Sequence, residues 1–111
     1  MNNSILNALR NSINQVDYLS IDTYEALNAV RNNPRLRDQL HKAYSLTDRA
    51  DQIAEAQTAN FLPFMEFYGT DGSQWTWQSP DWLPDGLQLL STLNKKVGSL
   101  HKSVALVANT M

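Results

Sequence analysis

The most informative stretch of the sequence spans residues 85–108 and reads DGLQLLSTLNKKVGSLHKSVALVA. Its main apolar residues recur in alternating steps of three and four, which places them on one face of a helix. These residues are Leu90, Leu93, Val97, Leu100, Val104 and Val107. Such spacing is typical of helices that cross at a shallow angle. The sequence therefore predicts a helix from about Asp85 to Ala108. Because glycine weakens a helix, we expect Gly98 to mark a tight contact with a neighbour.

The N-terminal part of the chain predicts two short helices. Apolar residues recur at helical spacing from Ser4 to Leu19, and Ser4 can cap the first helix. Asp22 can cap a second helix, because Glu25 follows it with the spacing of a capping box. The second helix should end at Asn32-Asn33-Pro34, since the residue before a proline disfavours helical geometry. We therefore expect a break in the helix around Ser20–Asp22.

The next segment predicts the longest helix of the chain. Pro34 suits the first position of a helix, with Asn33 as its cap. An alanine-rich stripe then extends from Leu36 to Phe61, and alanine permits helices to approach each other closely. Pro63 should end or kink this helix.

Residues 62–84 interrupt the helical pattern. Asp71-Gly72 lies between two aromatic-rich runs, which favours a type I′ turn and a β-hairpin. The hairpin would pair Tyr68 with Trp75 and Glu66 with Trp77. An alternative is that the preceding helix continues to Tyr68 and ends at Gly69 as its C-terminal cap. In both cases Ser79–Gly86 forms a turn-rich connector.

These elements together predict a mainly α fold in one helical domain, residues 1–111. We expect a small bundle of three to four helices with a short aromatic β-hairpin or irregular excursion near residues 62–84. The chain has 111 residues, 42% hydrophobic and 18% charged, which is a globular composition. The apolar seam on the helix at 90–107 exceeds what a short bundle needs. We therefore expect a two-fold homodimer through this helix.

Charge is unevenly distributed along the chain. Residues 48–85 contain seven acidic residues and one basic residue, whereas residues 86–111 contain three lysines and no acidic residue. These segments should attract each other, within the fold or between copies. The net charge of −2 does not suggest a nucleic-acid-binding protein. No apolar run is long enough to span a bilayer, so we expect a small soluble protein in the cytoplasm that does not bind membranes.

The residue inventory excludes the common catalytic and cofactor motifs. The chain has no cysteine, and its two histidines, His41 and His101, belong to no metal-binding motif and should lie on the solvated surface. No nucleophile-elbow motif and no glycine-rich phosphate loop occur. We therefore expect no catalytic residues, no bound metal and no cofactor.

Two groups of residues are candidates for binding a partner. The first is aromatic and consists of Tyr68, Trp75, Trp77 and Trp82. It could close the end of the helical core, form a protein interface, or hold a small molecule. The second is acidic and consists of Asp48, Asp51 and Glu55, on one side of the long helix. It could attract the basic last helix, face solvent, or carry out general acid–base chemistry.

The function that these observations favour is a non-catalytic protein–protein interaction module, such as an adaptor, an inhibitor or an immunity-type partner protein. The alternative is a small-ligand binding protein with an aromatic pocket under Trp75 and Trp77. An enzyme with a carboxylate site on the long helix ranks third. The sequence does not identify the partner.

Overall fold

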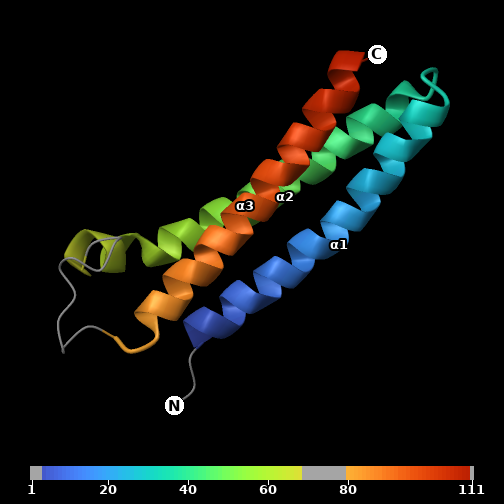
Figure 1. Ribbon diagram of the computed structural model, residues 1–111. Coiled ribbons are helices and arrows are strands. Elements are labelled where there is room, and N and C mark those ends of the chain that lie inside the picture. The colour runs from blue at the N-terminus through green and yellow to red at the C-terminus, as the bar shows by residue number, and fades with distance from the viewer. Residues whose placement is uncertain (1–3, 69–79, 111) are drawn as a thin grey trace.

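The computed structural model describes residues 4–68 and 80–110 (Figure 1). They form three helices, α1 (Ser4–Asn32), α2 (Arg37–Tyr68) and α3 (Leu83–Thr110). The helices run up, down and up, so that α2 is antiparallel to both of its neighbours (Figure 1). Each helix packs against both of the others, and the bundle is 58 Å long. The predicted helical bundle is confirmed, and none of the described residues lies in a strand.

The core extends along the length of the bundle because all three helices bury a stripe of apolar side chains. One cluster lies toward the end of the bundle that contains the N-terminus and includes Leu9, Val16, Phe61 and Leu93. A second cluster lies toward the turn between α1 and α2. Its buried members are Ala26, Leu27, Val30, Ala43, Val104 and Val107. Ala43, Ala50 and Ala54 of α2 are buried in the core.

The N-terminal segment is one continuous helix, so the predicted break around Ser20–Asp22 is wrong. Buried residues continue through this region, because Thr23 and Ala26 follow Leu19 in helical phase. The buried hydroxyl of Thr23 donates a hydrogen bond of 2.7 Å to the carbonyl oxygen of Leu19. Burial of a continuous stripe therefore outweighs the capping preference of Asp22.

The turn between α1 and α2 uses the residues that were expected to cap α2. The backbone N–H of Leu36 donates to the carbonyl oxygen of Asn33 at 3.0 Å, and the N–H of Arg35 donates to Asn33 Oδ1 at 3.2 Å. Pro34 is thus the second residue of a tight turn, where its fixed φ is favourable. Consequently α2 begins at Arg37 and not at Pro34.

The helix α2 continues through Pro63 to Tyr68, which corrects the predicted β-hairpin. Glu66 and Tyr68 are helical, so they are not the strand partners of Trp77 and Trp75. The alternative, a helix that continues to Tyr68, is confirmed in its extent. Residues 69–79, which include Asp71-Gly72, Trp75, Trp77 and the proposed Gly69 cap, lie outside the described residues.

Packing on both sides of Pro63 explains why the helix does not end there. Phe61 is fully buried, and the ring of Phe64 meets that of Trp82 edge-on with a centroid distance of 4.9 Å. These contacts stabilise the helical conformation before and after the proline. A proline removes one backbone hydrogen bond, and tertiary contacts of this kind offset that loss.

The apolar seam of α3 is buried inside the chain, so it gives no reason for the homodimer expected through the helix at 90–107, which stays a prediction. All six seam residues, from Leu90 to Val107, are at most 5% exposed. The helix begins at Leu83, two residues earlier than predicted, with Pro84 in its first turn, where proline is tolerated. The seam is therefore covered mainly by α1 and α2, and only Leu90 and Val97 contribute to the exposed lining between α2 and α3.

The tight glycine contact of α3 occurs at Gly86 and not at Gly98. A Cβ atom added at Gly86 would lie 2.7 Å from Cε1 of Phe61, whereas a Cβ atom at Gly98 would have no neighbour within 4 Å. The close approach of α3 to α2 therefore depends on Gly86. Within the described chain, Gly98 has no packing reason to be glycine.

Candidate partner-binding surface

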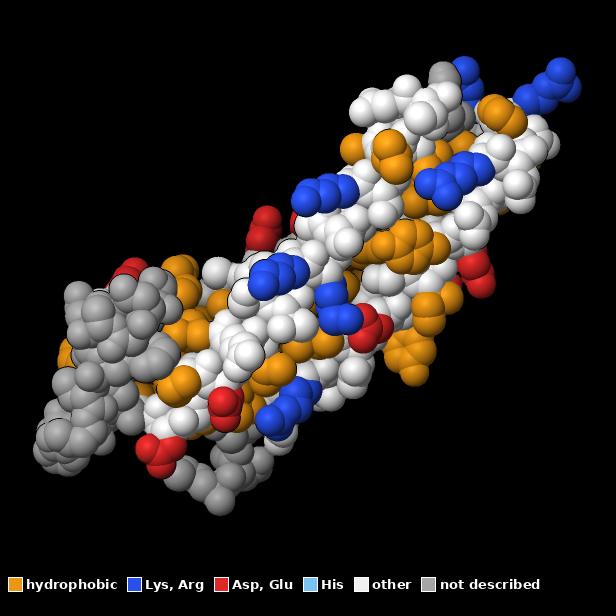
Figure 2. All heavy atoms as spheres, viewed as in Figure 1, with side chains coloured by type: hydrophobic (Ala, Val, Ile, Leu, Met, Phe, Trp, Pro, Cys, Tyr) orange, Lys and Arg blue, Asp and Glu red, His pale blue; other side chains and the backbone are white. Residues whose placement is uncertain are grey.

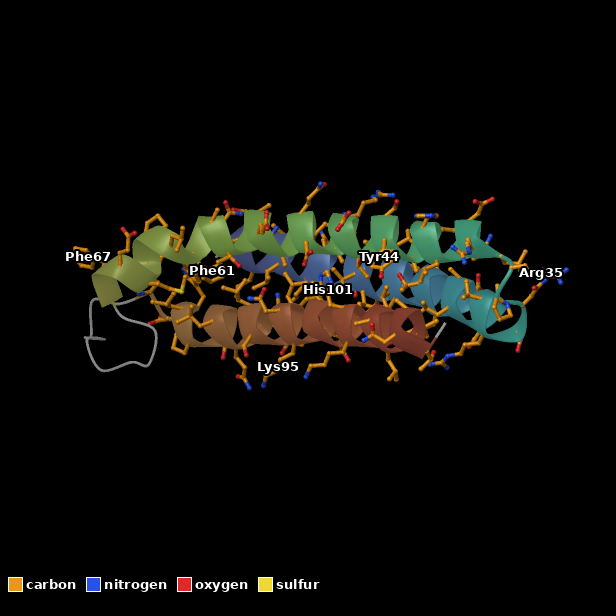
Figure 3. All side chains as sticks on the ribbon, turned by 90° about the horizontal axis from the view of Figure 1, so that it is seen from above. Arg35, Tyr44, Phe61, Phe67, Lys95 and His101 are labelled. Atoms are coloured by element: carbon orange, nitrogen blue, oxygen red, sulfur yellow. The ribbon has the colours of Figure 1, made fainter. Side chains whose placement is uncertain are left out.

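A groove lies between α2 and α3 on the side of the bundle away from α1. Figure 3 views these two helices side by side, with α1 behind them. One hollow of the groove has a volume of about 410 Å³. Its lining residues are Asp51, Ala54, Glu55, Thr58, Ala59 and Leu62 of α2 and Asn94, Val97, Gly98 and His101 of α3.

The groove continues toward the C-terminal end of α2. A second hollow of about 470 Å³ is lined by Met65 of α2 and by Leu87, Leu90, Ser91, Asn94 and Lys95 of α3. Asn94 lines both hollows, so they form one elongated depression along the two helices. Most of the exposed lining is apolar, and the side chain of Leu62 is 46% exposed. The depression therefore has the shape and chemistry that suit an amphipathic helix.

Small side chains keep the groove shallow and accessible. Ala54, Ala59 and Gly98 are the smallest residues of its lining, and they leave the backbones of both helices close to the surface. The absence of a side chain at Gly98 permits the backbone of another molecule to approach α3 closely.

A polar contact joins the two helices at one end of the first hollow. Nε2 of His101 lies 2.8 Å from Oδ2 of Asp51, and the two side chains are 45% and 39% exposed. Figure 3 shows His101 between α2 and α3. The acidic segment therefore contacts the last helix within the fold, as expected, but through a histidine and not through a lysine. Both histidines are exposed, as expected, and His101 in addition contacts Asp51.

Exposed charges of opposite sign lie on the two helices of the groove. Glu55 of α2 and Lys95 of α3 line it. Asp48 and Lys102 line neither hollow, but each lies seven residues from one of these charges on the same helix. We call Asp48 and Glu55 of α2 the acidic border, and Lys95 and Lys102 of α3 the basic border. All four residues are exposed, and none makes an ion pair or a side-chain hydrogen bond with another described residue. Figure 2 shows basic side chains on the face of the bundle that α3 forms, and in α3 these are all lysines. The groove is therefore acidic along one side and basic along the other.

The remaining lysine of α3 is directed to a different helix. Nζ of Lys96 lies 2.8 Å from Oδ1 of Asp17 on α1. Both side chains are more than a third exposed, so this pair contributes at most about 1 kcal/mol to stability. It leaves the basic border available for other partners.

The aromatic candidates are only partly described. Trp82 is half-buried, and its ring packs edge-on against Phe61 and Phe64, with centroid distances of 6.1 Å and 4.9 Å. This packing agrees with the interpretation that the aromatic group closes the end of the core. Trp75 and Trp77 lie outside the described residues, and Tyr68 is described only as the last residue of α2. The partner-binding role of these three residues stays a prediction.

No family model, no curated protein and no solved structure matches this chain. Within the described residues, no group of three or more His, Asp and Glu side chains is arranged to hold a metal ion. None of the described helices combines the length and the hydropathy that crossing a membrane requires. The functional argument therefore depends on the geometry of the α2/α3 groove.

Proposed function

We propose that the chain is a non-catalytic protein-interaction module that binds a helical partner in the α2/α3 groove. The observation that carries this proposal is the combination of an elongated apolar groove with unpaired charges along both sides. Helix-in-groove binding uses this pattern, because apolar anchors enter the groove and flanking charges set orientation. An adaptor or an inhibitor that acts in the cytoplasm fits this description.

Gly98 supports the same proposal. Glycine inside a helix costs about 1 kcal/mol relative to alanine. No contact within the described chain requires that cost, because a Cβ atom at this position would meet nothing within 4 Å. A partner backbone that approaches α3 at this point supplies a reason for the glycine.

The acidic residues predicted from the sequence are part of the same surface. Asp51 and Glu55 line the groove, and Asp48 lies on the next turn of α2. We assign them to the recognition of a partner's basic residues. The small-ligand alternative, a pocket under Trp75 and Trp77, stays a separate prediction because those residues are not described.

Site-specific photocrosslinking tests the proposal. A benzophenone amino acid is placed at Ala59 or Ser91, which are exposed at the edge of the groove, and in matched controls at Gln15 or Asn28, which are exposed on α1. In the cells that produce the protein, the groove positions should form a protein adduct and the controls should not. If neither groove position forms an adduct, or if the controls form the same adduct equally well, the proposal is wrong.

A further inference from the structure

We infer that the partner in the α2/α3 groove is a second copy of the same chain. This inference rests on the proposed function and adds the identity of the partner. The two copies lie face to face with a two-fold axis parallel to the helices, so that α2 of each copy lies over α3 of the other. The heights of the four border charges along the bundle favour this arrangement.

The contact between Asp51 and His101 places these two residues at about the same height along α2 and α3. The two helices are antiparallel. The residue three positions before Asp51 in α2 therefore lies at the height of the residue three positions after His101 in α3. Asp48 therefore lies at the height of Val104. Lys102 is two residues from Val104, which is about 3 Å along a helix. Asp48 and Lys102 thus lie at nearly the same height on opposite sides of the groove.

The same counting applies at the other pair of charges. Four residues after Asp51 is Glu55, which lies at the height of Val97. Lys95 is two residues from Val97, again about 3 Å and in the same direction. The two charges of each border are therefore seven residues, or about 10 Å, apart. The height difference between the acidic residue and the lysine is the same, about 3 Å, at both positions.

Two copies can face each other with their bundles parallel or antiparallel. The border charges are complementary only in the parallel arrangement. A two-fold axis along the bundle preserves height and exchanges the two sides, so Asp48 meets Lys102 and Glu55 meets Lys95 of the other copy. A two-fold axis across the bundle places α2 on α2 and brings acidic residues against acidic residues. Like charges that face each other are unfavourable, so the charges select the parallel arrangement.

The centre of such an interface is apolar. Each copy contributes the exposed side chain of Leu62 and the small residues around Gly98 to the centre, and the charged borders lie at the edges. Apolar seams bordered by complementary charges are the arrangement by which paired helices select partner and orientation. The interface is isologous, which is the usual form of a two-fold dimer.

Sedimentation equilibrium of charge-reversed variants tests the inference. The wild-type chain should dimerise at micromolar concentration. Reversal of the acidic border (Asp48→Lys with Glu55→Lys) or of the basic border (Lys95→Glu with Lys102→Glu) should weaken dimerisation by about tenfold or more, because like charges then face each other. An equimolar mixture of the two reversed variants should restore a dimer. Arg49→Glu, on another side of α2, is the control and should leave the association constant unchanged.

The outcomes separate this inference from the proposed function. A wild-type chain that is monomeric at high micromolar concentration overturns the second copy as partner, as does a mixture of reversed variants that stays monomeric. If the photocrosslinks at Ala59 and Ser91 then contain a different protein, the groove is an interaction site and only the partner assignment is wrong. If those positions also form no adduct, both conclusions fail.

Discussion

Alanine substitutions at the two glycines of α3 should change stability in opposite directions. At Gly98 an added methyl group meets no atom of the chain within 4 Å, so only the helix propensity changes. Gly98→Ala should therefore stabilise the monomer by up to about 1 kcal/mol. At Gly86 the added Cβ would lie 2.7 Å from Cε1 of Phe61 and 3.0 Å from its Cζ.

The ring of Phe61 has little room to move away from a side chain at Gly86. Phe61 is fully buried, and Trp82 packs edge-on against it at 6.1 Å. Overpacking of this kind costs about 1–3 kcal/mol, and the gain in helix propensity offsets at most about 1 kcal/mol. With the full offset, the net result for Gly86→Ala should be a loss of up to about 2 kcal/mol.

Urea denaturation followed by circular dichroism measures both changes, at a concentration low enough to keep the chain monomeric. In a thermal melt followed by the same signal, a difference of about 1 kcal/mol moves the melting temperature of a domain of this size by roughly 4 °C. Phe61→Leu should reduce the penalty of Gly86→Ala in a double-mutant cycle, because it removes the ring atoms that clash. If Gly86→Ala is as stabilising as Gly98→Ala, the packing at the end of the core is not as described.

Four further substitutions, in three experiments, test other parts of the bundle. Gln57 Nε2 donates to Ser12 Oγ at 2.9 Å, and Gln57 Oε1 is buried without a hydrogen-bond partner among the described residues. Ser12→Ala should therefore cost about 1–3 kcal/mol in urea denaturation, whereas Ser12→Ala with Gln57→Met should recover most of that loss. Phe61→Ala should cost about 3–5 kcal/mol by the same assay, and a much smaller loss would show that Phe61 does not anchor the core. Lys96→Met should change the free energy of unfolding by less than about 1 kcal/mol, because the ion pair of Lys96 with Asp17 is partly exposed. A larger loss would mean that solvent does not screen this pair.

The periodicity of apolar residues in the sequence was enough to predict the bundle, because an apolar stripe at helical spacing is buried by packing the helix against other helices. The seam of α3 was predicted residue by residue, and all of its members are buried. Local signals near the helix ends were less reliable. Asp22 has the pattern of a cap, yet the buried Thr23 carries the helix through this position. Pro63 is a helix breaker in isolation, yet packing of Phe61 and Phe64 keeps α2 intact.

The candidate site could be predicted only in part. Asp48, Asp51 and Glu55 were placed correctly on one side of a helix, because their spacing alone determines that. The other side of the groove was not predicted, since Asn94, Gly98 and His101 carry no motif. The pairing of Asp51 with His101 depends on the relative height of two helices, and no local pattern encodes that height. Gly98, near the centre of a helix, was a signal in the sequence. The structure was needed to show that the glycine faces open space and not a neighbouring helix.

The register of the dimer is the central claim, and cysteine crosslinking between two different chains tests it most directly. The chain contains no cysteine, so single cysteines can be introduced cleanly. A chain with Glu55→Cys is mixed with a chain with Lys95→Cys, and a short bifunctional thiol reagent is added. The mismatched mixture of Asp48→Cys with Lys95→Cys uses the same two helices but is displaced by seven residues, or about 10 Å. We predict a covalent heterodimer from the matched mixture and little or none from the mismatched one. Equal crosslinking of the two mixtures, or none in either, would contradict the proposed interface.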